Sequence, residues 1–432
     1  MKTDILIVGS GCAGLYCALQ LPREKQITII TKSDLESSDS FLAQGGMCVL
    51  RDEADYDSFM EDTLKAGHYE NDRHSVDVMI RSSRDVLQDL ISYGVDFNKD
   101  ENGELLYTRE GAHSNKRILF HADITGKEIT RKLLAAVKKL PNVTIYEHTA
   151  MIDLLVEENT VFGAVVKCSN DEIELITAEA TVLATGGIGG LYAHSTNFRH
   201  LTGDALAVAM KYGIELKDID YIQIHPTTFY TKDKTERSFL ISESVRGEGA
   251  KLRDKKGNRF VDELLPRDLL TKAILEQMEK DGTEHVWEDL RDIPEEELNS
   301  HFPNIVKHCL EHGYDVRKEC IPVVPAQHYF MGGIKVNDVS KTSMEALYAI
   351  GETACNGVHG KNRLASNSLL ESLVFAKRAA KDIAATQDSA DKNQYWQEFL
   401  NKNRNYYEDE QALEEEYREL VLNEIEKAKE AR

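Results

Sequence analysis

The sequence predicts an α/β protein in which one nucleotide-binding domain is assembled from both ends of the chain around an inserted domain. Three segments support this prediction, at residues 4–21, 181–187 and 346–360, because each joins a short apolar strand pattern to glycine. Parallel strands that end in glycine-rich turns form the sheet edge at which nucleotides bind. We therefore expect residues 226–318, between the second and third segments, to be the insertion.

The first segment, DILIVGSGCAGLYCALQL, has the spacing of a dinucleotide-binding turn. Gly9, Gly11 and Gly14 separate a buried strand pattern from a helix pattern. Missing side chains let the backbone approach a pyrophosphate, and the helix N-terminus attracts its charge. A second strand pattern follows at 27–30, but Thr31, Lys32 and Ser33 replace the acid that usually binds a ribose. The sequence thus predicts a nucleotide site with an unusual adenosine contact.

Composition restricts the class of protein. The chain has 432 residues and a formal charge of −22, which disfavours nucleic acids and anionic membrane surfaces as partners. The 7 cysteines are scattered without a CxxC pair, so we expect free thiols and no metal site. No apolar run approaches the ~20 residues of a spanning helix. These observations predict a cytoplasmic enzyme of two or three domains.

The stretch HGKNRLASNSLLES, residues 359–372, places cations before a predicted helix. Ser368 and Glu371 have the spacing of a capping box. His359, Lys361 and Arg363 stand just upstream, although a helix N-terminus favours anions. The pattern predicts an anionic ligand between these cations.

Other constrained cations occur far from this stretch. Arg267 follows Pro266 at a predicted helix start, His225 precedes a proline, and His328 precedes a glycine pair. An ion pair of Arg267 with Asp268, and structural roles for both histidines, are the alternatives. Because arginine forks bind carboxylates bidentately, Arg267 and Arg363 together suit a dicarboxylate.

Ten motifs in fixed order resemble the L-aspartate oxidase family of the succinate dehydrogenase and fumarate reductase flavoprotein group. They are GSGCAG, SFLAQGG, TREGAHS, LATGG, QIHPT, SESVRGEGA, LPRD, PAQHYFMGGI, AIGE and HGKNRLASNSLLE, and they span about residues 3–385. The resemblance implies an α/β fold: a Rossmann-like FAD-binding domain with an inserted α+β capping domain and a short helical C-terminal tail. The domains would be 1–225 and 319–388 (FAD-binding), 226–318 (capping) and 389–432 (helical).

The resemblance also implies the site residues. Arg267, Glu110 and His225 would be catalytic, with Glu110 favouring an amino-bearing substrate over plain succinate. The substrate would contact His328, Arg363, Ser242 and Gln223. Asp39 replaces the histidine that attaches FAD in membrane-bound relatives, so the flavin would be non-covalent. The expected FAD contacts are Gly9, Gly11, Gly14, Lys32, Ser40, Gln44, Gly45, Gly46, Gly186, Asp204, Glu352, Ser368 and Leu369.

The activity implied is FAD-dependent oxidation of L-aspartate to iminosuccinate, the first step of NAD biosynthesis, with oxygen or fumarate reoxidising the flavin. The expected ligands are L-aspartate and fumarate, with a functional link to quinolinate synthase. The alternative is a soluble fumarate reductase or succinate dehydrogenase flavoprotein on the same dicarboxylate site.

Overall fold

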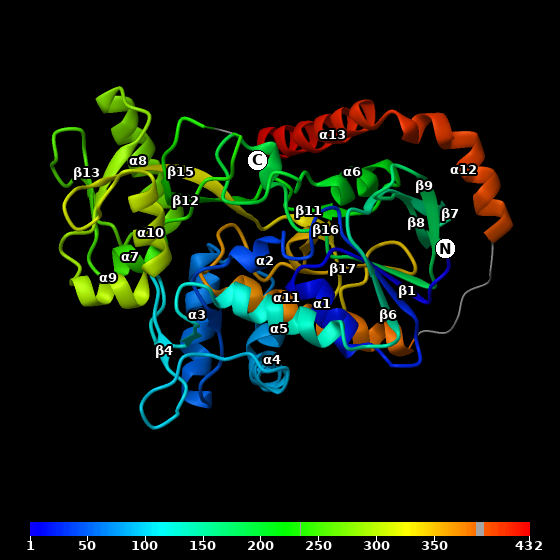
Figure 1. Ribbon diagram of the computed structural model, residues 1–432, viewed down its shortest axis with the longest axis horizontal. Helices are drawn as coiled ribbons and strands as arrows, with labels where there is room; N and C mark the ends of the chain where they lie inside the picture. Colours follow the sequence, from blue (N-terminus) through cyan, green and yellow to red (C-terminus); the bar gives the residue numbers. More distant parts are fainter. Residues whose placement is uncertain (234, 386–392) are drawn as a thin grey trace.

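A five-stranded parallel sheet forms the centre of the larger part of the molecule (Figure 1). The computed structural model describes residues 1–233, 235–385 and 393–432. β1 lies in the middle, with β2 on one side and β10 on the other, so the strand order reverses there. The sheet runs in the order β17 (Leu347–Ala349), β10 (Ala180–Leu183), β1 (Ile5–Val8), β2 (Ile27–Ile30) and β6 (Val143–Tyr146).

Both faces of this sheet are covered, which explains why its central strands are continuously apolar. Ile5 and Ile7 pack into one core and Leu6 and Val8 into another on the opposite face. On the first face α1 packs between α11 and α5 (Figure 1). The helices contributing to this core are α1 (Cys12–Gln20), α3 (Tyr56–Ala66), α4 (Arg73–Ser92), α5 (Thr125–Val137) and α11 (Asn367–Ala385).

The second face carries a three-stranded antiparallel sheet and the C-terminal helices, which lie along the top of the molecule (Figure 1). The fully buried Asp153 accepts hydrogen bonds from Lys211 Nζ at 2.6 Å and from Tyr407 OH at 2.7 Å, so one carboxylate joins three of these elements. The elements are β7 (Ala150–Glu157), β8 (Thr160–Lys167), β9 (Ile173–Thr177), α6 (Asp204–Lys211), α12 (Asn393–Glu408) and α13 (Glu410–Glu430).

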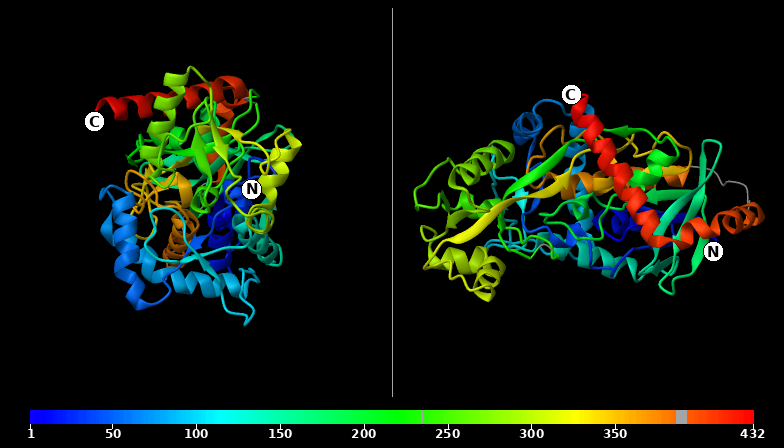
Figure 2. Two further views of the ribbon diagram at one scale, coloured as in Figure 1. Left: turned by 90° about the vertical axis from the view of Figure 1, so that its left-hand side faces the viewer. Right: turned by 90° about the horizontal axis from the view of Figure 1, so that it is seen from above.

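A third core belongs to the chain between 229 and 323, at the left of Figure 1. Its sheet has the order β12, β15, β14, β13, and the long strands β12 and β15 run from this part towards the parallel sheet, as the right view of Figure 2 shows. Its elements are β12 (Ile222–Phe229), β13 (Lys251–Arg253), β14 (Val286–Asp289), β15 (Ile321–Phe330), α7 (Glu243–Gly247), α8 (Arg267–Asp281), α9 (Glu295–His301) and α10 (Pro303–Glu311).

Short elements complete the fold. One three-stranded sheet joins β11 (Leu216–Lys217), β16 (Gly333–Lys335) and β18 (Ala354–Cys355), and another joins β3 (Met47–Cys48), β5 (Ile118–Leu119) and β4 (Tyr107–Thr108). α2 (Asp39–Leu42) is one turn long. Among the described residues, no helix combines the length and apolarity needed to cross a membrane.

The structure confirms the α/β fold class. The predicted domain boundaries stay predictions, and the boundary at 388/389 falls outside the described residues. The helix predicted after Pro266 begins at Arg267, with Pro266 as its N-cap. The capping box predicted for Ser368 and Glu371 is wrong, because α11 begins at Asn367 and Glu371 contacts Asn356 and Ser372 instead.

A buried carboxyl in the third core generates a prediction about stability. Glu288 is fully buried, and neither of its oxygens has a hydrogen-bond partner among the described residues. Burial, opposed by Arg246 and reinforced by Glu263, raises the pKa of Glu288 from 4.5 to about 8. The folded state therefore holds this proton more tightly than the unfolded state. The contribution of Glu288 to stability is greatest below its unfolded pKa and is lost as pH rises through about 8.

We expect Glu288→Gln to unfold at a higher temperature than the parent at about pH 9. It should lose this advantage at about pH 5, where the side chain at position 288 is uncharged in both folded proteins. Thermal unfolding followed by circular dichroism at both pH values measures this. Glu284→Gln, which alters a carboxyl elsewhere in the same part of the chain, is the control. An equal effect of Glu288→Gln at both pH values would contradict the assignment.

Candidate active site

One cavity extends from the carboxyl ends of β1 and β10 to the third core. Its lining includes Gly9 after β1, Ala184 after β10 and Ile350 after β17, and at the other end Ser242 and Arg267. Ligands of open α/β sheets bind where the strand order reverses, and β1 occupies that position here.

The glycine turn after β1 is required by close packing. Gly9 has φ +120°, and a Cβ there would lie 2.0 Å from the carbonyl oxygen of Ala184. A Cβ on Gly14 would lie 2.2 Å from the Gly9 carbonyl oxygen. These two glycines let α1 begin directly at the end of β1, with its N-terminus at the cavity. Gly11 lines the cavity itself.

Lys32 and Asp204 form an ion pair at the same end of the cavity. Lys32 Nζ lies 2.7 Å from Asp204 Oδ2 and donates to Thr202 Oγ1 at 3.3 Å. All three residues line the cavity. Lys32 thus takes the place after β2 where an acid is usual, and Asp204 balances its charge.

The segment 38–44 presents polar atoms that the protein leaves unpaired. Ser38 Oγ, Asp39 Oδ2 and Gln44 Oε1 are buried without a hydrogen-bond partner among the described residues, and all three side chains line the cavity. Buried polar groups are normally hydrogen-bonded. Together with the glycine turn, these atoms fit a large polar ligand such as a dinucleotide.

Two carboxyls in this region, those of Asp39 and Glu352, have pKa values near neutral pH. Burial raises the pKa of Asp39 to about 7, although the Phe198 amide and Arg237 oppose the shift. Burial and the nearby Asp39 raise the pKa of Glu352 to about 8. Glu352 Oε1 accepts the backbone N–H of Phe330 at 2.9 Å, which fixes its position.

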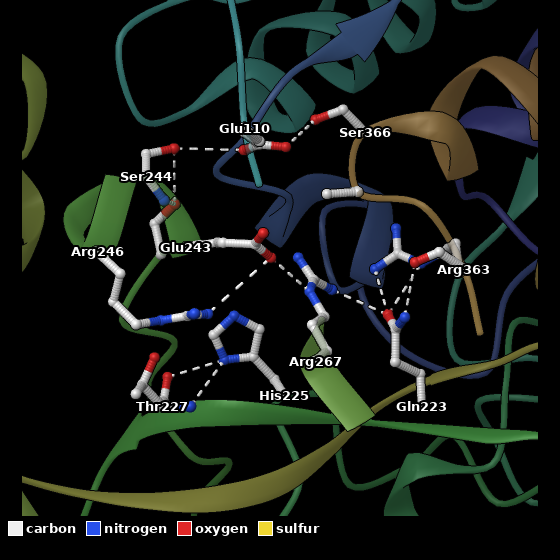
Figure 3. Close-up of polar contacts among 12 residues, drawn as sticks. Glu110, Gln223, His225, Thr227, Glu243, Ser244, Arg246, Arg267, Arg363 and Ser366 are labelled. Atoms are coloured by element: carbon white, nitrogen blue, oxygen red, sulfur yellow. Dashed lines mark hydrogen bonds and ion pairs between the residues drawn. The ribbon is translucent and has the colours of Figure 1, made fainter. Parts of the chain in front are cut away.

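At the opposite end, two arginines share one acceptor. Arg267 Nη1 donates to Gln223 Oε1 at 2.9 Å, and Arg363 Nη2 donates to the same oxygen at 3.1 Å (Figure 3). Arg267 Nε also donates to Glu243 Oε2 at 2.7 Å. Burial and the charge of Arg267 lower the pKa of Arg363 to about 10, so the Arg363 guanidinium group is still charged at neutral pH.

The two histidines lie beside these arginines and are neutral. The His225 and His328 rings meet edge to face, with centroids 5.2 Å apart. Burial and nearby cations, Arg267 for His225 and Arg363 for His328, lower both pKa values well below the usual range. The Thr227 backbone holds His225 Nδ1, and Nε2 has no hydrogen-bond partner among the described residues (Figure 3).

Glu110, in the loop after β4, lies at the same end of the cavity as the arginines. Its carboxyl accepts hydrogen bonds from Ser366 Oγ at 2.7 Å and from Ser244 Oγ at 3.3 Å (Figure 3). Burial and the charge of Glu243 raise the pKa of Glu110, while Ser366, Arg267 and Ser244 act against the rise.

The structure brings nearly all the predicted site residues to this one cavity. Gly14 lies behind the glycine turn, and Gln223 lies between the two arginines rather than on the cavity wall. The others line it: Glu110, His225, Ser242, Arg267, His328 and Arg363 at one end, and Gly9, Gly11, Lys32, Ser40, Gln44, Gly45, Gly46, Gly186, Asp204, Glu352, Ser368 and Leu369 along the rest.

The prediction that His359, Lys361 and Arg363 share an anion is wrong. His359 is buried, and burial together with Arg363 lowers its pKa to about 3, so it is neutral. Lys361 is half exposed and lies 3.8 Å from Glu70. Only Arg363 reaches the cavity, and its Nη1 donates to Ser368 Oγ at 2.6 Å.

Glu243 is the main site residue that the sequence analysis did not select. Burial favours its neutral form, but the charges of Arg267 and Arg246 outweigh burial and lower its pKa. Arg246 Nη2 lies 4.0 Å from Glu243 Oε2 (Figure 3). The signal available was the spacing of Glu243 and Arg246, which places them on one side of a helical turn.

Comparison with known proteins identifies the family. An FAD-binding domain model matches residues 4–369. The L-aspartate oxidase of Clostridium perfringens is 52% identical over 386 residues, covering 89% of this chain and 88% of the relative. The L-aspartate oxidase of Clostridium acetobutylicum is 49% identical over 383 residues, with 89% and 88% covered. The chain belongs to the L-aspartate oxidase family.

Solved structures place this family within a wider flavoprotein group. The E. coli quinol fumarate reductase subunit FrdA superposes with a TM-score of 0.84 at 29% identity, covering 91% of this chain and 72% of that one. The Mycobacterium smegmatis Sdh1 structure gives 0.78 at 28% identity, covering 93% and 72%. As a member of the L-aspartate oxidase family, the protein is an FAD-dependent oxidoreductase. The glycine turn and the unpaired atoms of segment 38–44 provide the fit for FAD.

Proposed function

We propose that the protein oxidises L-aspartate to iminosuccinate with non-covalently bound FAD, the first step of NAD biosynthesis. The observation that supports this most strongly is the pair of Arg267, whose side chain is only 11% exposed, and the buried Arg363 beside Glu110, in a cavity continuous with the nucleotide site. Two guanidinium groups suit two carboxylates, and a carboxylate suits an ammonium group.

Charge balance favours this substrate. Arg246, Arg267 and Arg363 lie near Glu110 and Glu243 (Figure 3), and His225 is neutral, so the cations of this group outnumber its anions. L-Aspartate carries two carboxylates and one ammonium and has one net negative charge. Binding it would neutralise the site, which matters because unpaired buried charge is strongly unfavourable.

In this mechanism the protein holds and orients the substrate. Arg363 with His328, and Arg267 with His225 and Ser242, bind the two carboxylates. Glu110 binds the ammonium group. Fixing all three groups presents C2 in one orientation, and positioning of this kind supplies much of an enzymatic rate. Bound FAD would accept the hydride that leaves C2, and the ammonium group would lose a proton so that its nitrogen can form the C=N bond of the imine.

Arg267 is held in place for this role. Glu243 and Gln223 occupy two of its nitrogens, and the remaining N–H groups are available to a carboxylate. Since guanidinium stays protonated in proteins, electrostatic stabilisation is the simpler role for Arg267, and proton transfer during fumarate reduction is the alternative.

Fumarate and oxygen are the proposed oxidants of the reduced flavin. The likeness to fumarate reductase supports fumarate, because the same arginines suit this dicarboxylate. Iminosuccinate hydrolyses readily, which favours a functional link to quinolinate synthase as the next enzyme. The absence of a histidine at the Asp39 position supports non-covalent FAD and a cytoplasmic amino acid oxidase over a membrane-associated succinate dehydrogenase.

Anaerobic reduction of the bound flavin tests the function. We expect L-aspartate to bleach the flavin absorbance and succinate to leave it oxidised, because succinate lacks the amine that Glu110 binds. Flavin released by heat or acid would establish non-covalent attachment. Bleaching by succinate and not by L-aspartate would assign the protein to the dicarboxylate reductases instead.

We expect Arg267→Leu to lower kcat/KM for L-aspartate by about a hundredfold or more, because a charged contact with the substrate is lost. Stopped-flow flavin reduction measures the effect. Flavin content and thermal unfolding show whether the variant is folded. Arg259→Leu, which removes a half-exposed arginine paired with Glu263, is the matched control. Parental reduction rates in Arg267→Leu would remove this residue from the mechanism.

A further inference from the structure

Two hydroxyl groups hold the two oxygens of Glu110 separately. Ser366 Oγ donates to Oε2 at 2.7 Å, and Ser244 Oγ donates to Oε1 at 3.3 Å (Figure 3). Ser366 comes from the loop before α11, and Ser244 from α7 in the third core. The orientation of the Glu110 carboxyl plane is therefore fixed by hydrogen bonds from two separate parts of the fold.

Ser366 is held in an unusual conformation. It has φ +62°, a left-handed backbone that non-glycine residues rarely adopt. Its Oγ also accepts the backbone N–H of Gly46 at 3.1 Å, and its carbonyl oxygen accepts the N–H of Cys48 at 3.0 Å. Because the Gly46 N–H can only donate, the hydroxyl hydrogen of Ser366 is left for Glu110, whose Oε2 accepts it. Strained residues are retained where the surrounding structure determines them, often at functional sites.

The loop that carries Glu110 is tied to the same segment. His113 Nε2 lies 3.0 Å from the carbonyl oxygen of Ala365, and Arg117 Nη1 lies 3.1 Å from His113 Nδ1. The fully buried Arg117 pairs with Asp55 at 2.8 Å and with Asp62 at 2.6 Å. This network fixes the distance between Ser366 and Glu110, because the hydrogen bond from His113 to Ala365 joins the loop of Glu110 to the residue before Ser366.

The surroundings of Glu110 make its charge difficult to maintain. Glu243 repels a negative charge on Glu110. The buried Cys48 lies near Glu110 as well. Arg267 and Arg363 attract it, but both also interact with other groups. Burial raises the pKa of Glu110, and the hydroxyl of Ser366 is the largest of the opposing influences. A protonated Glu110 would lose its attraction for an ammonium group.

We infer that Ser366 and Ser244 are positioning residues that keep Glu110 ionised and directed at the substrate amine, so that they set the preference for an amino dicarboxylate over a plain one. The inference rests on the proposed function. It goes beyond the role of Glu110 itself, because it assigns substrate preference to two hydroxyls that need not touch the substrate.

The test uses the FAD-loaded enzyme and the variants Ser366→Ala and Ser244→Ala. Alanine is no more strained than serine at φ +62°, so Ser366→Ala adds no backbone strain and removes the donor to Glu110 together with the acceptor for the Gly46 N–H. We expect Ser366→Ala to raise KM for L-aspartate about tenfold at neutral pH, as for loss of a hydrogen bond to a charged group, with a much smaller change in kcat. Ser244→Ala is expected to act in the same direction and more weakly, because its contact is longer.

The pH profile separates this role from a merely structural one. Since Ser366→Ala raises the pKa of Glu110 further, the acidic limb of kcat/KM for L-aspartate is expected to move to higher pH. Succinate has no amine, so its dissociation constant, measured from the perturbed flavin spectrum, is expected to stay within about twofold of the parent or to decrease. In a Glu110→Gln background, Ser366→Ala is expected to have no further effect on L-aspartate.

Ser83→Ala is the matched control. Ser83 is fully buried and accepts the backbone N–H of Leu50 at 3.0 Å, as Ser366 accepts that of Gly46, but it lies on α4 outside the cavity. Equal losses of L-aspartate and succinate binding in Ser366→Ala, or an unmoved acidic limb, would overturn the inference while leaving the proposed function intact. A parent enzyme reduced by succinate and not by L-aspartate would overturn both. If Ser366→Ala does not fold, Ser244→Ala decides by the same criteria.

Discussion

The active-site end of the cavity depends on two largely enclosed positive charges, Arg267 and the buried Arg363, that their neighbours do not fully neutralise. Arg267 and Arg363 converge on one amide oxygen of Gln223. Of these two arginines, only Arg267 has an ion pair with a carboxylate of the described residues, that of Glu243. Bringing two guanidinium groups together in a buried site is unfavourable unless an anion joins them. The fold accepts this because α8, β12 and the loop before α11 each fix one member of the group, and the anion that restores balance is the proposed substrate.

The same constraint explains the neutral histidines and the supported glutamate. His225 and His328 cannot become charged beside two guanidinium groups, so they remain hydrogen-bonding groups and not further cations. Glu110 is the carboxylate to which the proposed function assigns the ammonium group of the substrate. Its serine contacts and the buried Arg117 network anchor it against the neighbouring Glu243. Charge at one end of the cavity and unpaired polar atoms at the other thus serve different parts of one reaction.

Much of this was predictable from local sequence. The glycines at 9, 11 and 14 predict the turn through their spacing between a strand pattern and a helix pattern, and the close contact of Gly14 with the Gly9 carbonyl is local, whereas the contact of Gly9 with Ala184 is not. Pro266 predicts the start of α8, and therefore the position of Arg267, for a similar local reason. What the sequence could not give was pairing across the fold. Glu243 and Ser244 acquire their roles only when α7 meets the loops at 110 and 366.

The wrong predictions have the same origin. Lys361 was expected beside the anion because it is close to Arg363 in sequence, but it points to Glu70 on another element. The apolar residues of α13 include Leu413, Tyr417, Leu420, Val421 and Ile425. Leu420 is 36% exposed, whereas Val421 is fully buried, because the buried face follows a spacing of four residues. Periodicity predicts that a helix has a buried face, but the packing partner decides which neighbouring residue occupies it.

The most direct test of the charge argument compares succinate with butyrate, which has the same chain length and one carboxylate fewer. Their dissociation constants for the oxidised holoenzyme can be measured from the perturbed flavin spectrum and by calorimetry. The account predicts that butyrate binds about a hundredfold more weakly or worse, because one buried guanidinium group would remain without an anion. Binding of butyrate within a few-fold of succinate would contradict it, since the two arginines would then not form a dicarboxylate site.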